Sequence, residues 1–173
     1  HDSCCVTRIS LVTHTGTHVD AEAHVIHGGK RLGDYPLTAF SGLARVADLR
    51  GLSVVDASAL DSIESCDWLL LCTGQSEKWG SEEYFGTEPL FTEAFVKTAA
   101  RIARKGIGLD CSGLDREGVA LHCVWFSSGG GLMVENLTDL EILLSESQIL
   151  FAAYPLKLAA VDGAPVRAVA VLG

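Results

Sequence analysis

The run Trp68-Leu69-Leu70-Leu71-Cys72 constrains the fold most, because five consecutive apolar side chains suit few structures. In a β-strand successive side chains point to opposite faces of the sheet. An uninterrupted apolar run of strand length must therefore be covered on both faces, as in the middle of a sheet that other elements flank. This run predicts a central, buried strand.

The segments on either side of this run alternate between strand-like and helix-like patterns. A helix is predicted from an N-cap at Thr92 to a stop at Gly106, because apolar residues recur between them at helical spacing. Residues 121–125 predict a second helix, and Asp56 is a candidate cap for a short helix that reaches Ile63. Further strands are predicted at residues 6–13, 44–49, 107–110, 132–135, 149–154 and 166–172. Strands that alternate with helices indicate an α/β class with a mixed sheet, and we expect residues 1–173 to form one such domain.

Composition excludes several classes of partner. The 13 basic and 22 acidic side chains give a net charge of −9, so a nucleic-acid binder is not expected. No apolar run approaches the roughly 18 residues of a membrane helix, and a membrane partner is not expected either. The six cysteines include no C-x-x-C pair, so they are interpreted as reduced thiols of a cytoplasmic protein. The sequence begins without methionine, so a preceding segment stays an alternative.

Four of the six histidines lie within fourteen residues, at His14, His18, His24 and His27. In the segment 14–20 an extended chain puts His14, His18 and Asp20 on one face. A helix would also bring the first two together, but the threonines, glycine and valine between them are poor helix formers. Two imidazoles and a carboxylate are a common ligand set for a divalent metal. His27 and the terminal His1 fit no such pattern and are predicted to have no chemical role.

The segment 73–88 is polar and rich in glycine, yet it contains Trp79, Tyr84 and Phe85. Large aromatic side chains in a loop need apolar contacts. We therefore expect this loop to cover a pocket.

The pattern His-x-Gly-Thr-His-x-Asp-x-x-x-His, from His14 to His24, resembles the signature of the cyclase-like metal-dependent hydrolases. Bacterial kynurenine formamidase and isatin hydrolase are members of that family. The similarity continues to the C-terminus, over about nine tenths of the chain, in the segments 42–49, 71–74, 108–112, 135–137, 155–157 and 162–168, and at His122.

This resemblance implies two metal sites that share a carboxylate. His14, His18 and Asp20 are implied to bind one metal, and Asp20 is implied to bridge to a second metal together with His122 and Glu135. The implied cofactor is one or two divalent ions, expected to be zinc, with manganese as the alternative.

Three further expectations follow from the resemblance. His24 is implied to be the general acid/base rather than a ligand, since a neutral imidazole can take a proton and deliver it to a leaving nitrogen. Asp110 and Ser112 are interpreted either as orienting partners of the histidines or as strand-end caps. The family fold is a swivelling β/β/α domain, expected in a homodimer or homotetramer.

The implied reaction is hydrolysis of a non-peptide C–N bond by metal-activated water. The activity that the resemblance favours is that of an arylformamidase, which converts N-formylkynurenine to kynurenine and formate in tryptophan catabolism. A cyclic-amide hydrolase of the isatin type and a non-catalytic metal-binding domain are the alternatives, and the presence of His24 favours an enzyme. Glu22 and Val25 replace the usual proline and aromatic residue of the family, and its N-terminal Asp-Leu-Ser strand is lacking. These differences leave the substrate less defined than the reaction.

Overall fold

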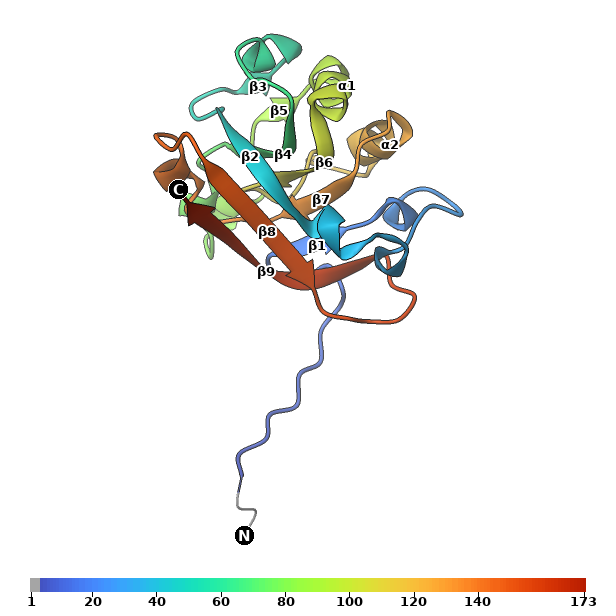
Figure 1. Cartoon of the computed structure of the whole chain (residues 1–173). Helices are drawn as coiled ribbons and strands as arrows, with labels where there is room; N and C mark the ends of the chain where they lie inside the picture. The colour runs from blue at the N-terminus through green and yellow to red at the C-terminus, as the bar shows by residue number, and fades with distance from the viewer. Residues whose placement is uncertain (1–3) are drawn as a thin grey trace.

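Seven strands form one closed, barrel-like sheet in the computed structural model, which describes residues 4–173 (Figure 1). His1 lies outside these residues. The strand order is β1-β7-β6-β4-β2-β8-β9. The strands are β1 His18–Asp20, β2 Ser41–Asp48, β4 Cys66–Cys72, β6 Ala103–Leu109, β7 Leu132–Glu135, β8 Ile149–Pro155 and β9 Gly163–Leu172.

The sheet is mixed. Strands β2, β4, β6 and β7 run parallel to one another, whereas β1, β8 and β9 pair antiparallel to their neighbours. A separate parallel pair joins β3 Val54–Val55 to β5 Leu90–Phe91. The two α-helices, α1 Glu93–Ile102 and α2 Ala120–Ser127, pack against each other beside the parallel strands (Figure 1). The predicted α/β class with a mixed sheet is confirmed.

Strand β4 lies in the middle of the parallel strands and is buried on both faces, as its apolar run predicts. Leu69 and Leu71 pack in the core that the helices cover, whereas Trp68 and Leu70 pack in the core inside the barrel. The ring of Trp68 lies 5.1 Å from that of Phe151 on the opposite strand β8. Burial of each leucine side chain contributes about 1.5–3 kcal/mol, so this strand anchors both cores.

Helix α1 begins as predicted but ends earlier. The side chain of Thr92 accepts a hydrogen bond from the Phe95 N–H, which confirms the N-cap. The predicted continuation to Gly106 is wrong, because the chain enters β6 directly after Ile102. A Cβ at Gly106 would lie 2.4 Å from the carbonyl oxygen of Leu132. The glycine therefore permits close approach of β7 rather than ending a helix.

Two other predictions, the strand at residues 6–13 and the helix cap at Asp56, are wrong in whole or in part. Residues 6–13 form no strand; they extend away from the body, and Val6 and Ile9 are 84% and 75% exposed (Figure 1). Alternating side chains do not make a strand without a neighbour to complete the hydrogen bonds. Asp56 stands at the N-cap position of the 3₁₀ helix Ala57–Leu60, which ends before the predicted Ile63; its side chain makes no capping hydrogen bond and accepts one from the Thr92 hydroxyl instead.

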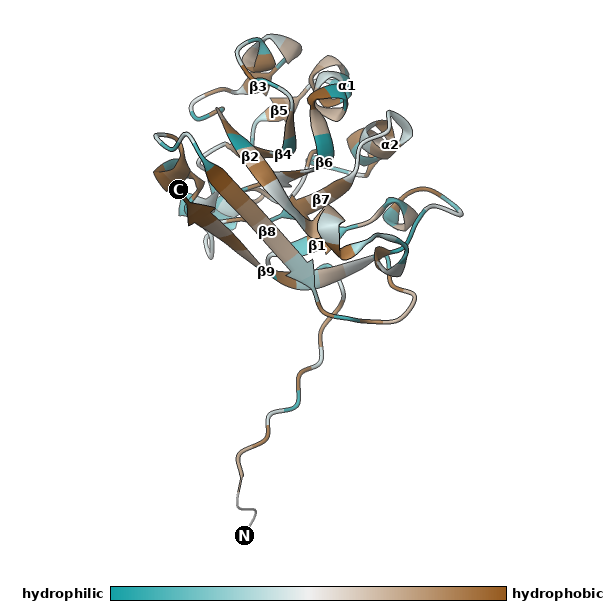
Figure 2. Cartoon of the chain, viewed as in Figure 1, coloured by the Kyte–Doolittle hydropathy of each residue, from teal (hydrophilic) through white to brown (hydrophobic). Residues whose placement is uncertain are grey.

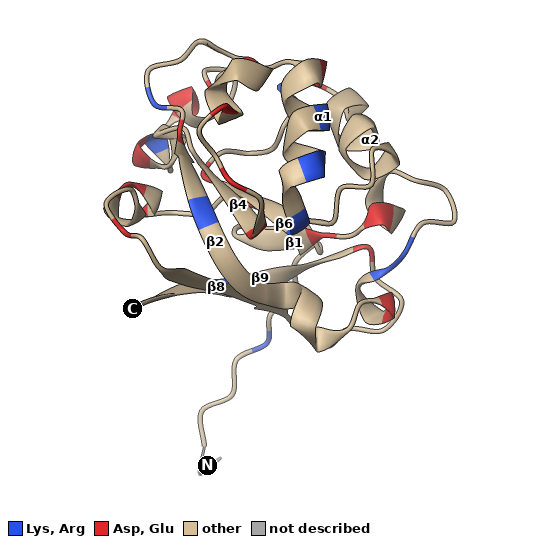
Figure 3. Cartoon of the chain, turned by 45° about the horizontal axis from the view of Figure 1, so that its top comes forward, with Lys and Arg blue, Asp and Glu red and all other residues tan. Residues whose placement is uncertain are grey.

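Acidic and basic residues are dispersed over many elements of the chain rather than gathered in one (Figure 3). Acidic residues occupy several loops and turns, and basic residues appear on β2 and along α1. No helix within residues 4–173 combines the length and the apolar character that crossing a membrane requires.

Candidate metal centre

Strand β1 brings the first candidate ligands between two other strands. His18 pairs with Glu135 of β7, and Asp20 pairs with Gly163 of β9. Because His18 and Asp20 are two residues apart in a strand, their side chains point to the same face. Both are buried, at 3% and 1% exposure. A three-residue strand thus places an imidazole and a carboxylate in the interior.

His14 reaches the same place from the turn that precedes β1. Gly16 has φ +63°, a left-handed conformation that glycine adopts without cost and that turns the chain into the strand. The His14 ring lies against Gly163, where a Cβ would come within 2.6 Å of His14 Cε1. The missing side chain of Gly163 therefore makes room for this imidazole.

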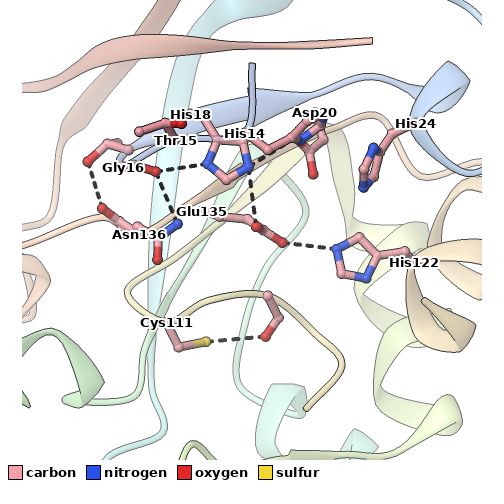
Figure 4. A network of polar contacts seen from close by, with 12 residues as sticks. His14, Thr15, Gly16, His18, Asp20, His24, Cys111, His122, Glu135 and Asn136 are labelled. Carbon is pink, nitrogen blue, oxygen red and sulfur yellow. Dashed lines mark hydrogen bonds and ion pairs between the residues drawn. The ribbon is translucent and has the colours of Figure 1, made fainter. Parts of the chain in front are cut away.

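The donor atoms form two groups that share Asp20 (Figure 4). One group is His14, Asp20 and His24; the other is His18, Asp20 and Glu135. Asp20 Oδ1 lies 2.8 Å from His14 Nδ1 and 3.3 Å from His18 Nε2, and His18 Nε2 lies 3.4 Å from Glu135 Oε2. His14 and His18, which the sequence grouped together, both face Asp20 Oδ1, and this carboxylate joins the two donor groups to which they belong.

His18 is held in one orientation. Its Nδ1–H donates a hydrogen bond of 2.8 Å to the carbonyl oxygen of Gly16, which leaves Nε2 to face Asp20 and Glu135. The Asn136 side chain donates to the same carbonyl oxygen. A backbone carbonyl commonly orients a metal-binding imidazole in this way.

His122 joins the second group from helix α2. Its Nε2 lies 2.9 Å from Glu135 Oε1, and its Nδ1–H donates to Asp115 Oδ2 at 2.7 Å. Asp115 also accepts the backbone N–H groups of Leu121 and His122 at the start of the helix. Asp115 was not among the residues predicted from the sequence. Its signal was an acidic residue shortly before a predicted helix, where the positive end of the helix dipole favours a carboxylate.

Opposite charges shift the pKa values of these groups strongly. Contact with Asp20 raises the pKa of His14 to about 9, against the effect of burial. Burial lowers the pKa of His122, but its hydrogen bonds to Asp115 and Glu135 outweigh this and raise the pKa to about 10. Burial also raises the pKa of Asp20, but the two neighbouring imidazoles outweigh it and hold that pKa well below its usual range. The buried carboxylates therefore require positive charge beside them.

The residues fit a divalent metal. No Lys or Arg lines this cavity within residues 4–173, so protons on the imidazoles or a cation must balance the carboxylates. Asp20 Oδ1 is buried and receives no hydrogen bond of acceptable geometry, although two imidazole nitrogens face it. A cation between the two imidazole nitrogens and this carboxylate oxygen would give the oxygen the partner that it lacks. Imidazoles and carboxylates suit zinc and other divalent first-row metals.

His24 lies at the end of the 3₁₀ turn Glu22–His24. Its ring centroid is 4.1 Å from that of His14 and 6.2 Å from that of His122 (Figure 4). Its Nδ1 lies 3.2 Å from Asp162 Oδ2. His24 is thus a member of the first donor group, and it lies next to the candidate ligand His14. His27, three residues on, is exposed.

These residues line a cavity of about 340 Å³, a size typical of small-molecule sites. Trp79 and Phe85 from the loop 73–88 line it too, with 56% and 68% of their surface exposed. Tyr84 lies buried between them in edge-to-face contact, and its hydroxyl donates to Asn136 Oδ1 at 2.6 Å. The prediction that this loop covers a pocket is confirmed. A second cavity, of about 390 Å³, is lined mainly by aliphatic residues near β9, without a comparable donor group.

The structure distinguishes the two interpretations of Asp110 and Ser112, as partners that orient the histidines or as strand-end caps. Asp110 is fully buried and accepts hydrogen bonds from the backbone N–H groups of Thr73 and Gly74 and from the Thr73 hydroxyl. It fixes the turn after β4, and within residues 4–173 no hydrogen bond joins it to a histidine. Ser112 lines the cavity, and its hydroxyl donates to the buried Glu88. The residues that orient histidines are instead Asp115 and Asp162.

The chain is similar to known proteins over most of its length. A family model described as a putative cyclase matches residues 2–116. The kynurenine formamidase of Bacillus cereus is 30% identical over 169 residues, which cover 95% of this chain and 78% of that protein. The kynurenine formamidase of Geobacillus thermodenitrificans is likewise 30% identical over 169 residues, or 94% of this chain and 78% of the relative.

Solved structures show the same fold. A potential metal-dependent hydrolase with cyclase activity superposes with a TM-score of 0.77 at 29% identity, covering 93% of this chain and 80% of that one. Isatin hydrolase A from Labrenzia aggregata superposes with a TM-score of 0.78 at 24% identity, covering 94% of this chain and 75% of that one. At this low sequence identity, the similarity to isatin hydrolase A shows a common fold and nothing about function.

Proposed function

The chain belongs to the cyclase family of hydrolases, and from that premise we propose that it hydrolyses aryl formamides, N-formylkynurenine first among them. The observation that carries this proposal is one cavity with two kinds of wall. Two donor groups that share Asp20 form one wall, and the exposed rings of Trp79 and Phe85 form another. An aryl amide presents a carbonyl to the first wall and a ring to the second. The kynurenine formamidases among the relatives support this substrate class.

We assign five residues to the metal. His14, His18 and Asp20 would hold one divalent ion, and Asp20, Glu135 and His122 would hold a second. When bound, such an ion supplies a Lewis acid that lowers the pKa of water from about 15.7 toward about 7 and polarises a carbonyl. The role of the protein is to hold these donors in place before substrate arrives.

His24 is assigned to proton transfer. Its Nδ1 faces Asp162, whereas its Nε2 makes no hydrogen bond within residues 4–173 and is available to a reactant. Water adds to the formyl carbon while His24 Nε2 takes the proton that the water loses. The same nitrogen then gives that proton to the departing nitrogen as the C–N bond breaks, so an arylamine and formic acid leave, and the formic acid releases its proton to water to become formate.

The aromatic loop is assigned to binding. Trp79 and Phe85 offer ring faces and edges to an aryl group, with edge-to-face or offset contacts worth about 0.5–1.5 kcal/mol each. The buried Tyr84 links this loop to Asn136, which directly follows Glu135. The binding surface and the donor groups are therefore joined by one short hydrogen-bonded connection.

The test is a hydrolysis assay on metal-loaded protein with N-formylkynurenine, formanilide and isatin. We expect turnover of both formamides. Substitution His24→Ala should lower kcat by about 10²–10⁴-fold while metal content stays unchanged. His27→Ala is the matched control, because this exposed histidine of the same segment should leave both quantities unaltered.

The other outcomes decide between the alternatives. Turnover of isatin without turnover of the formamides would replace the proposal by a cyclic-amide hydrolase. Tight metal binding without turnover of any of the three would make the chain a metal-binding domain. Normal turnover in His24→Ala would remove His24 from proton transfer.

Three finer points belong to the same proposal. Zinc is the expected metal, with manganese as the alternative, because borderline imidazole donors stand beside hard carboxylate oxygens. Tryptophan catabolism in the cytoplasm is the expected context of such a formamidase. We also propose a homodimer or homotetramer, which the largely hydrophobic strands β8 and β9 support (Figure 2). Exposed on these strands are Leu150, Tyr154, Val169 and Val171. Light scattering of the purified protein measures the assembly directly.

A further inference from the structure

Asp162 immediately precedes β9, and pairing with β1 fixes its backbone. Its carbonyl oxygen accepts the N–H of Ala21 at 2.8 Å, next to the pairing of Asp20 with Gly163. The following residue, Gly163, has no side chain to separate this loop from His14. The pairing of β1 with β9 therefore fixes the position of the Asp162 carboxylate beside the histidines.

One oxygen of this carboxylate serves two imidazoles. Asp162 Oδ2 lies 3.1 Å from His14 Nε2 and 3.2 Å from His24 Nδ1. The two rings stack with their centroids 4.1 Å apart and their planes inclined by 33°. A carboxylate oxygen only accepts hydrogen bonds, so each imidazole must direct an N–H at it.

The consequence concerns the opposite nitrogen of each ring. A neutral imidazole carries one proton, and the hydrogen bond at one nitrogen decides whether the other presents a lone pair. His14 Nδ1 faces a second carboxylate, Asp20, 2.8 Å away, so Asp162 alone does not set the tautomer of His14. With its proton on Nδ1, His24 presents Nε2 as a lone pair. Asp162 thus sets the tautomer of the candidate base, His24.

We propose that Asp162 is the positioning residue of this site, holding His24 in the Nδ1–H tautomer. The part of this proposal that concerns proton transfer rests on the proposed function. The part that concerns the tautomer rests only on the contacts of Asp162. Without Asp162, His24 would place its proton on Nε2 in a fraction of molecules, and those molecules would lack the base.

The direct test is the tautomer of His24 in ¹⁵N-labelled, zinc-loaded protein. Long-range ¹H–¹⁵N spectra distinguish Nδ1–H from Nε2–H, and loss of the signals in His24→Ala identifies them. We expect Nδ1–H in the unmodified protein. In Asp162→Ala we expect the proton to move to Nε2. In Asp162→Asn the amide oxygen still accepts a hydrogen bond, so Nδ1–H should be retained.

Kinetics supply the second readout. Asp162→Ala should lower kcat for formanilide by about 10–100-fold, the usual effect of losing a residue that orients a metal-site imidazole, with little change in KM. Asp162→Asn should restore part of that loss. Asp61→Ala, which removes an exposed carboxylate from a surface turn, is the matched control and should keep both values.

The two readouts separate this proposal from the proposed function. Retention of Nδ1–H at His24 in Asp162→Ala would overturn the positioning role, whatever the protein hydrolyses. A shift to Nε2–H in a protein that hydrolyses no amide would support the positioning role and refute the proposed function. If Asp162→Ala fails to give a folded spectrum, Asp162→Asn carries the test, and loss of Nδ1–H there would overturn the proposal.

Discussion

A methyl group added at Gly163 is predicted to disable the metal centre without altering any of its ligands. A Cβ at this position would lie 2.6 Å from Cε1 and 2.9 Å from Nε2 of His14. The φ angle of Gly163 does not lie in the left-handed region, so alanine is acceptable to the backbone. The effect of Gly163→Ala is therefore steric and directed at one imidazole.

The size of the effect follows from the contact distances. Ordinary van der Waals contact of a Cβ begins at 3.4 Å, so the nearest ring atom must retreat by 3.4 − 2.6 = 0.8 Å. Metal–ligand distances tolerate only about 0.2 Å, and a displacement of about 1 Å at a catalytic site can cost about 10²-fold in rate. Overpacking should also cost about 1–3 kcal/mol of stability, which corresponds to a fall in Tm of about 2–12 °C.

The assay is competition for zinc against a chromophoric chelator, combined with elemental analysis of the purified variant. Gly33→Ala is the matched control, because an added Cβ there meets no atom within 4 Å and φ again lies outside the left-handed region. We expect the control to bind zinc like the unmodified protein. Zinc affinity in Gly163→Ala equal to that of Gly33→Ala would refute the placement of His14 at the metal.

Four further predictions concern the metal, the substrate and the core. Zinc at 100 times its Kd should stabilise the folded protein by about 2.7 kcal/mol and raise Tm by about 5–11 °C in calorimetry, whereas an unchanged Tm would argue against a site in the folded state. Asp115→Ala should lower zinc affinity by about 10–100-fold, because His122 loses its orienting partner, and titration with a chelator measures it. Trp79→Ala should raise KM for formanilide by about threefold to tenfold with little change in kcat; an unaltered KM would exclude this ring from binding. Leu69→Ala should lower the free energy of unfolding by about 2–5 kcal/mol in urea denaturation, because this side chain is completely buried.

Local patterns predicted the elements that local physics determines. The apolar run of β4 required cover on both faces, and Thr92 could cap only a helix that follows it. The end of α1 was predicted wrongly, because Arg104 and Lys105 suit a helix end by composition but lie in a strand. Lys105 donates to the carbonyl oxygen of Ser41 at 2.8 Å, a contact that depends on the neighbouring strand.

In the candidate site too, residues close together in the sequence could be predicted and contacts between distant segments could not. His14, His18 and Asp20 are close in sequence, so their spacing already indicated a common ligand set. Asp162 contacts His14 and His24 across 148 and 138 residues of chain, and no pattern within either segment contains that information. It depends on the pairing of β1 with β9, which the fold alone provides.

The central claim is that a metal held around Asp20 makes this chain an amide hydrolase. The most direct measurement is formanilide hydrolysis by one preparation before chelation, after complete removal of metal, and after titration with zinc. We predict loss of activity on removal and full recovery at one or two equivalents of zinc, with no recovery in Asp20→Asn. Full activity in the metal-free protein, or recovery in Asp20→Asn equal to that of the unmodified protein, would contradict the account.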